Sequence, residues 1–238
     1  MTGAVSETES LRKTISTLLE ICKHDDIAEI LICYPDRVTP ECLAVINELA
    51  EFKCDVPINV FKQKSPFMAF VKDLIEAAKG SHCILVPSDL ALDLSVVPKM
   101  IEGAKKEPDT IFSASRWLKG CEFYNYGRIK KLINFCGQKF LAVLYMRNLT
   151  DFTDPVQIAP SELYKSINFE ETRFPIFAEM ILKPIRLGYK FKELPTNCYP
   201  RTDGKSSNSA GEILAYLRVA FHIRFMPKKD ILLEEYRK

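Results

Sequence analysis

The most informative acid of this chain stands directly after a short apolar run. Residues 83–86 read Cys-Ile-Leu-Val, and Pro87, Ser88 and Asp89 follow them. A run of this kind is typical of a strand buried on both faces of a parallel sheet. Because ligands of open α/β sheets bind at the carboxyl ends of the strands, Ser88 and Asp89 are predicted to contact a metal ion or a sugar hydroxyl. The alternative, that Asp89 only caps the next helix, is equally compatible with the pattern.

Polar side chains also follow two other strand-like runs. Tyr34 and Asp36 come after a predicted strand at 28–33, and Arg116 comes after a predicted strand at 110–115. If these strands share one parallel sheet with the first, their ends line a common crevice.

A glycine-containing loop in the C-terminal third supplies further cations. It reads Arg-Thr-Asp-Gly-Lys-Ser-Ser and contains Arg201, Lys205 and Ser206. Such a loop can fold over an anion, because arginine offers forked donors and lysine a point charge. Acids, a divalent cation and a basic loop together suit a nucleotide diphosphate sugar, whose diphosphate they would stabilise as the leaving group.

Several other functions are disfavoured by what the sequence lacks. It contains no P-loop, no dinucleotide fingerprint and no G-x-S-x-G, and none of its eight cysteines forms a C-x-x-C. The net charge of +2 gives no global polybasic field, so no nucleic-acid partner is expected. The first nine residues lack the basic start and apolar core of a signal peptide, and we expect a cytoplasmic protein.

Strand-like and helix-like segments alternate as far as residue 115, which predicts parallel strands joined by right-handed crossovers. Beyond residue 120 we predict a long amphipathic helix, an irregular segment, a helix that Pro184 kinks or ends, a strand and a last helix, at residues 126–146, 148–160, 175–187, 189–194 and 211–225. The prediction is a single α/β domain over residues 1–225, followed by a charged tail at 226–238.

The order of these elements, together with six short motifs, resembles a family 2 glycosyltransferase of the GT-A fold, nearest to the dolichyl- and polyprenyl-phosphate mannosyl- or glucosyltransferases. The resemblance extends from about residue 7 to about residue 224. The motifs are Ser88-Asp89-Leu90, Val97-Pro98-Lys99-Met100, Ser115-Arg116-Trp117, Asp154-Pro155, Arg186-Leu187-Gly188-Tyr189 and the loop at 201–207.

This resemblance implies a Rossmann-like, mostly parallel sheet flanked by helices. It also implies a metal-dependent, inverting hexosyltransferase, with Mg²⁺ or Mn²⁺ as cofactor. Its donor would be a UDP- or GDP-linked sugar, and its acceptor a lipid phosphate or a glycan.

The resemblance also implies a role for individual residues. Asp89 falls on the last acid of the family's D-x-D, which binds the metal and the diphosphate. Arg116 falls near the nucleotide sugar, and Arg201, with Lys205 and Ser206 beside it, falls on the loop that closes over the phosphates. Glu179 falls where relatives carry an acid near the acceptor and is a candidate general base. Alternatively, Glu179 is a surface acid beside a core helix face.

The N-terminal donor motifs depart from the family pattern. The first strand is reduced to a stub, with Glu7 as the remnant of the turn that holds the base. The paired acids after the second strand become Tyr34 and Pro35, and Pro87 replaces the first acid of the D-x-D. One acid can hold a metal when diphosphate oxygens and waters complete the coordination.

Three interpretations follow. An active transferase is favoured by Asp89, Arg116, Arg201 and Lys205. A catalytically inactive, scaffold-like member is the alternative that the replaced acids suggest. A nucleotidyltransferase is disfavoured, because no glycine-rich N-terminal loop is present.

The segment 211–225 leaves a further choice open. It is apolar and carries Arg218 and Arg224, which fits a peripheral contact with the cytosolic face of a membrane. An ordinary packing helix with a solvated basic end fits equally well.

Overall fold

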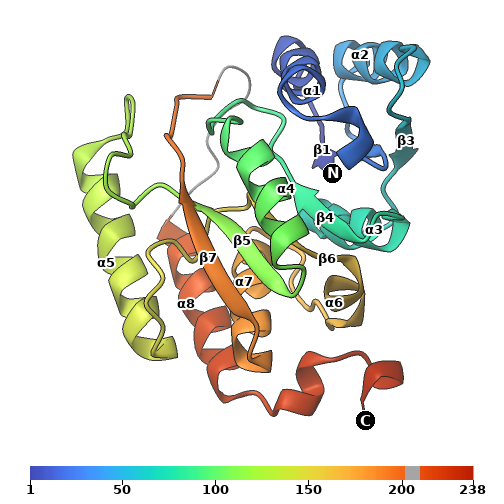
Figure 1. Ribbon diagram of the computed structural model, residues 1–238. Coiled ribbons are helices and arrows are strands. Elements are labelled where there is room, and N and C mark those ends of the chain that lie inside the picture. Colours follow the sequence, from blue (N-terminus) through green and yellow to red (C-terminus); the bar gives the residue numbers. More distant parts are fainter. Residues whose placement is uncertain (202–209, 238) are drawn as a thin grey trace.

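The strands of the computed structural model, which describes residues 1–201 and 210–237, form two sheets joined edge to edge (Figure 1). One sheet has the order β1-β2-β3, and the other has the order β4-β6-β5-β7. Met1 connects them, because its nitrogen donates to Ile84 O and its carbonyl accepts from Val86 N, both at 2.9 Å. This is the bonding pattern of a parallel pair. The strand order across the molecule is therefore 3-2-1-4-6-5-7.

The first half alternates strands with helices as predicted. Its elements are β1 (Thr2–Gly3), α1 (Glu9–Ile21), β2 (Ile30–Tyr34), α2 (Pro40–Glu51), β3 (Ile58–Lys62), α3 (Phe70–Ala77), β4 (His82–Leu85), α4 (Val96–Lys106) and β5 (Thr110–Ser115). The second half contains α5 (Arg128–Tyr145), β6 (Gln157–Pro160), α6 (Ser161–Ser166), α7 (Ile176–Leu187), β7 (Lys190–Pro195) and α8 (Ala210–Phe225). The α/β architecture and the mostly parallel sheet are confirmed.

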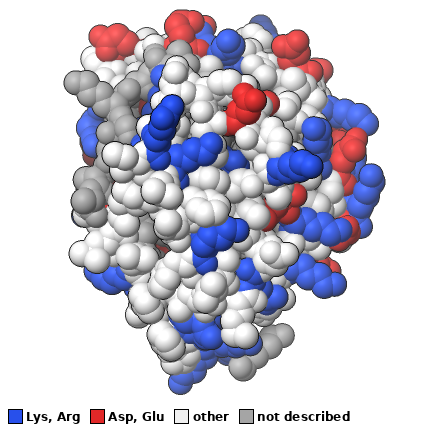
Figure 2. All heavy atoms as spheres, turned by 90° about the vertical axis from the view of Figure 1, so that its left-hand side faces the viewer, with Lys and Arg blue, Asp and Glu red and all other residues white. Residues whose placement is uncertain are grey.

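Helices cover both faces of the sheet, and β2 shows why its residues are almost uniformly apolar. Ile30 and Ile32 pack into a cluster with α1 and α2, whereas Leu31 and Cys33 pack into a second cluster with α3. Successive side chains of a strand point to opposite faces, so a strand buried on both sides has no polar positions. Helix α5 forms the left edge of the molecule in Figure 1, and α8 contacts it. Figure 2 shows the molecule from that left-hand side.

The directions of the strands bring several carboxyl ends to one edge. β4 and β5 both pair antiparallel with β6, so they run parallel to each other, and β7 runs parallel to β5. The chain reverses its order of progression between β1 and β4, which makes this point the topological switch of the sheet. A ligand is therefore expected where β1 and β4 end.

Strand β6 corrects the prediction of an irregular segment at 148–160. Its four residues, Gln157–Pro160, pair with β4 on one side and β5 on the other. The strand is short, begins two residues after Pro155 and ends at Pro160, and prolines usually mark strand ends or loops. No alternation is visible in so short a run, which is why the sequence pattern did not indicate it.

Helix α7 continues through Pro184 to Leu187, so the helix does not end at this proline, as one of the two predicted outcomes had it. A proline inside a helix leaves the carbonyl four residues earlier without its usual donor. Here the hydroxyl of Tyr164 lies 3.5 Å from that carbonyl, Met180 O, and donates to it. The helix ends instead at Gly188, whose φ of +99° places it in the left-handed region that glycine tolerates.

The residues after 225, expected as a charged tail, pack against the domain. Ile231 is fully buried, and its carbonyl accepts from Asn168 N at 2.8 Å. Leu233 N donates to Ser166 O at 2.9 Å. These bonds attach the segment to the region between α6 and α7.

Two glycine-to-alanine substitutions are expected to change stability in opposite directions. A Cβ at Gly103 of α4 would lie 2.6 Å from the buried ring of Phe112, so Gly103→Ala should lower the free energy of unfolding by about 1–3 kcal/mol. A Cβ at Gly137 of α5 meets nothing within 4 Å. Gly137→Ala should raise the free energy of unfolding by up to about 1 kcal/mol, through helix propensity alone. Urea unfolding measures both, and equal effects would contradict the packing of α4 on β5.

Candidate functional site at the carboxyl edge of the sheet

The loop after β4 is held tightly at the switch point. Ser88 is buried, and its hydroxyl donates to Gly3 O at 2.7 Å, which fixes the loop to the end of β1. Asp89 Oδ1 accepts from Ala91 N at 3.1 Å. Leu90, between them, has a φ of +55°, an unusual conformation for a branched side chain. Unfavourable backbone geometry of this kind is frequent where a loop must aim a functional side chain.

Asp89 and Arg201 are in direct contact. Arg201 Nε lies 3.0 Å from Asp89 Oδ2, although the two residues come from the separate segments that follow β4 and β7. The side chain of Asp89 is 14% exposed and that of Arg201 is 38% exposed. The proximity predicted from the sequence is therefore confirmed. The alternative, that Asp89 caps the next helix, is wrong: α4 begins at Val96 with Ser95 as its N-cap, and Asp89 Oδ1 bonds to Ala91 N within the loop.

Arg116, at the end of β5, lies in a buried acidic cluster. Its Nε and Nη2 donate to the two oxygens of Asp151 at 2.7 and 2.9 Å, and Asp154 Oδ2 lies 3.3 Å from Nε. Both carboxylates are completely buried. Sequence reasoning did not identify Asp151 as the partner of Arg116. The only indication of this partner in the sequence was the pair of acids, Asp151 and Asp154, that precedes β6.

The electrostatics of this cluster are set by burial. Desolvation raises the pKa of Asp154 to about 7, Arg116 acts in the opposite direction, and the charge of Asp151 adds to the increase. Burial also disfavours the charged form of Arg116, but Asp151 and Asp154 outweigh it and keep the pKa of Arg116 above its ordinary value. One guanidinium therefore neutralises one acid fully, and the second acid retains its proton more readily.

Asp154→Asn is expected to change how stability depends on pH. The unfolded chain ionises Asp154 near the ordinary pKa of 3.8, whereas the folded chain keeps the proton until about pH 7. As pH rises between these values, the wild type should lose free energy of unfolding relative to the variant, and the difference should level off above the folded pKa. Urea unfolding of both proteins across this range measures it. A difference independent of pH would contradict the raised pKa.

The predicted residues of the first sheet lie at the ends of their strands. Glu7, after β1, accepts from Val5 N and Ser6 N at 2.7 and 3.0 Å, so its carboxylate folds back onto its own turn. Asp36, after β2, forms an exposed ion pair with Lys62 at the end of β3. Tyr34, the last residue of β2, is partly buried. Lys205 and Ser206 lie outside the described residues.

Glu179 is enclosed in α7. It is 1% exposed, lies 2.6 Å from Lys183 Nζ, and accepts backbone N–H groups of Glu170 and Glu171. The alternative of a surface acid is therefore wrong. The role of general base stays a prediction, and in this structure the carboxylate serves to neutralise a buried lysine and to fix the 170–171 turn.

The fit of a divalent cation rests on Asp89. Within residues 1–201 and 210–237 no three His, Cys, Asp or Glu side chains gather as a metal cage. Mg²⁺ is commonly held by one or two carboxylates together with substrate phosphates and waters. Asp89 fits such a shared site, and Arg201 is the group that a cation would displace from it.

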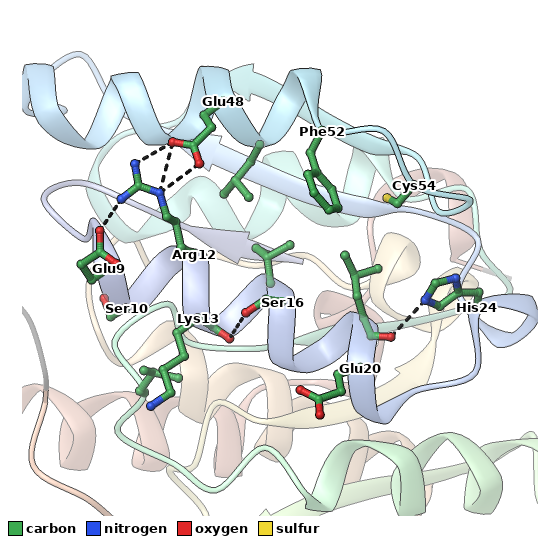
Figure 3. A pocket seen from close by; sticks show the side chains of 14 residues that line it. Glu9, Ser10, Arg12, Lys13, Ser16, Glu20, His24, Glu48, Phe52 and Cys54 are labelled. Atoms are coloured by element: carbon green, nitrogen blue, oxygen red, sulfur yellow. Dashed lines mark hydrogen bonds and ion pairs between the residues drawn. The ribbon is translucent and has the colours of Figure 1, made fainter.

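A hollow of 730 Å³ lies elsewhere, between α1 and α2 (Figure 3). Arg12 stands in its wall between Glu9 and Glu48, and its guanidinium bonds to both carboxylates. Of the loop after β4, only Leu90 reaches this hollow. The candidate site is therefore assigned to the strand ends, where the acid and the cation meet.

Comparison with known proteins gives relatives in sequence and in fold. No family model matches the chain. A dolichol-phosphate mannosyltransferase of Pyrococcus furiosus is 26% identical over 179 residues, which are 73% of this chain and 49% of that protein. The chain thus spans about half the length of this curated relative.

The similar solved structures include glucosyl-3-phosphoglycerate synthase of Mycobacterium tuberculosis. Its complex with Mn²⁺, UDP and phosphoglyceric acid matches with a TM-score of 0.61 at 13% identity, covering 95% of this chain and 78% of the synthase. Its complex with Mn²⁺, UDP-glucose and phosphoglyceric acid matches with a TM-score of 0.64 at 12% identity, covering 95% and 79%. At this identity the likeness establishes the fold.

Proposed function

This chain has the GT-A fold of the family 2 glycosyltransferases, and from that premise we propose that it is a metal-dependent, inverting hexosyltransferase. Its donor is a UDP- or GDP-linked sugar, and its acceptor is a lipid phosphate or a glycan. The observation that carries the proposal is the contact between Asp89 and Arg201, 3.0 Å apart beside the topological switch of the sheet.

The geometry suits charge stabilisation of a leaving group. In an inverting transfer, an acceptor oxygen forms a bond to the anomeric carbon while the bond to the diphosphate oxygen breaks on the opposite face. A phosphate acceptor attacks with an oxygen that is already ionised, whereas a glycan hydroxyl gives up its proton to a general base. The electron pair of the broken bond stays with the diphosphate, which gains negative charge. Arg201 can turn from Asp89 to the diphosphate and donate to it from a fixed edge of the sheet. A Mg²⁺ or Mn²⁺ ion at Asp89 would neutralise further charge on the same group.

The relatives support the donor and the acceptor class. The synthase structures contain UDP or UDP-glucose with Mn²⁺, which supports a nucleotide diphosphate donor and a divalent metal. The sequence relative is named for dolichol phosphate, which supports a lipid-phosphate acceptor. An acceptor of that kind would bring the protein to a membrane surface.

The ends of the first sheet favour a second candidate, a GT-A protein that binds partners without turnover. Asp36 is neutralised by Lys62, and Glu7 is occupied by its own backbone. In this arrangement neither carboxylate is available to bind the nucleobase of a donor.

A binding screen separates the two candidates. UDP- and GDP-hexoses are tested by thermal shift and calorimetry with and without Mn²⁺, and positive donors are then assayed for transfer to a polyprenyl phosphate. A Mn²⁺-dependent donor that is turned over supports the transferase. Tight, Mn²⁺-dependent binding of a donor counts against the second candidate, whereas absence of binding by every donor supports it and contradicts the proposed transferase site.

A further inference from the structure

Strand β3 is an unpaired edge of the sheet. The strand order leaves β3 and β7 as the two edges, and within residues 1–201 and 210–237 the only strand that pairs with β3 is β2. In Figure 1, β3 lies near the right-hand margin of the molecule. An edge strand presents a row of backbone N–H and C=O groups to solvent, and these groups can pair with another chain.

The ladder with β2 shows which backbone groups of β3 point outward. Pro57 and Gln63, immediately before and after the strand, both bond to β2 through their backbone at 2.8 Å. Along a strand, alternate residues direct their backbone groups to the same side. The odd-numbered residues of β3 therefore bond to β2, whereas the N–H and C=O groups of Ile58, Val60 and Lys62 point away from it.

The two edges of the sheet differ in how they are protected. Proteins protect edge strands with charges and prolines, and β7 carries two lysines, a glutamate and a terminal proline. The other edge, β3, contains the apolar residues Ile58, Val60 and Phe61, which are only partly buried. Lys62 is its one charged residue and already forms an ion pair with Asp36. Strand β3 is therefore the less protected edge.

We propose that β3 pairs antiparallel with β3 of a second copy of this chain, about a twofold axis at Val60. In this register Val60 lies opposite its own counterpart, and Ile58 lies opposite Lys62 of the second copy. Every outward N–H and C=O group of the strand then has a hydrogen-bond partner. The contact is isologous, so association stops at two copies. The interface does not depend on sugar transfer.

The charges at the two ends of β3 fit this direction of pairing. Lys62 and Lys64 are exposed at the carboxyl end. Asp55, which is 92% exposed, and Glu29 stand at the amino end, where Lys53 offsets part of their charge. Antiparallel pairing brings the carboxyl end of each copy beside the amino end of the other, so lysines approach acids. Parallel pairing would set like charges side by side.

Helix α5 offers a second apolar surface for self-association, because Ile129 and Val143 are 77% and 78% exposed. The helix carries four cations and no acid. A symmetric contact through α5 would bring the cations of the two copies together, which disfavours it. No helix of the described part of the chain is long and apolar enough to cross a membrane.

Two substitutions at Val60 test the interface by sedimentation velocity, in which the wild type should have the mass of a dimer at micromolar concentration. Val60→Lys places two like charges directly opposite each other. Val60→Pro removes an outward N–H but leaves the ladder with β2 intact, and edge strands accept proline at such positions. Each variant should weaken the dimer at least about tenfold. Circular dichroism checks that both variants are folded.

Ile129→Lys is the matched control, because it also replaces an exposed aliphatic side chain by lysine, on α5 at the opposite margin of Figure 1. It should dimerise as the wild type does. Val60→Cys should form an intermolecular disulfide on mild oxidation, because opposed hydrogen-bonded residues have Cα atoms about 5.5 Å apart, within the reach of a disulfide. The wild type, with its own eight cysteines, is the blank for this reaction.

Three results would overturn the proposal. The first is a wild type that stays monomeric at every concentration tested. The second is a Val60→Lys variant that dimerises as tightly as Ile129→Lys, or a dimer that Ile129→Lys abolishes. The third is a Val60→Cys variant that gives no more cross-linked dimer than the wild type.

Discussion

Replacing Asp89 with Asn is expected to abolish Mn²⁺-dependent binding of the donor sugar and to lower turnover by at least about 100-fold. Asparagine keeps the size of the side chain and the acceptor for Ala91 N, but it removes the charge that would hold the cation. It also removes the ionic partner of Arg201. Calorimetry with the donor found in the screen, with and without Mn²⁺, measures the first effect, and a transfer assay measures the second.

Asp93→Asn is the matched control for this variant. Asp93 lies four residues further along the same loop and accepts from Ser95 N at 2.9 Å. Its substitution should leave donor affinity and its metal dependence unchanged. Equal losses in the two variants would point to a general disturbance of the loop, and unchanged turnover in Asp89→Asn would refute the assignment of the site.

Arg116→Met is expected to produce the largest loss of stability, about 3–5 kcal/mol in the free energy of unfolding. The variant leaves Asp151 and Asp154 buried without the guanidinium that faces both. An unpaired carboxylate in a dry site must either stay charged at high cost or take up a proton. Urea unfolding measures the loss, which should be smaller at acid pH, where both acids are neutral.

Arg12→Met provides the comparison on the surface. Arg12 pairs with Glu9 and Glu48, and solvent reaches all three side chains. Its removal should change stability little, because water screens exposed pairs. Equal stability of Arg116→Met and Arg12→Met would show that the buried cluster contributes no more to the free energy of unfolding than an exposed ion pair does. If Arg116→Lys kept stability but lost donor affinity, the role of Arg116 beside the nucleotide sugar would be supported.

The features that were predicted best are those that depend on local sequence patterns. The apolar run at 83–86 correctly located the central strand β4, and the alternation of elements correctly implied parallel strands in the first sheet. From these two points followed the common edge that carries Asp89, whereas the place of Arg201 beside it was implied by the basic loop and the family resemblance. The periodicity of residues 126–146 likewise located α5 to within two residues.

Pairings between distant segments could not be predicted from such patterns. Arg116 is 35 residues from Asp151, and Glu179 bonds to the backbone of the 170–171 turn, which lies outside its own helix. Periodicity shows which side of a helix is apolar, but it does not identify the partner of a buried charge. The exposure of apolar residues of α5 such as Ile129 and Val143 could not be predicted for the same reason, because an exposed apolar stripe and a buried one have the same spacing.

The antiparallel strand β6 also sets a length scale for whatever binds at this edge. It separates β4 from β5, so the backbones that carry Asp89 and Arg116 end two strand intervals apart, about 10 Å. The oxygens around a bound Mg²⁺ or Ca²⁺ lie only about 2.0–2.6 Å from the ion. Because the Arg116 guanidinium is itself a cation and cannot ligate a metal, no single metal ion joins the two strand ends, and a molecule that touches both must be elongated and lie across the intervening strand.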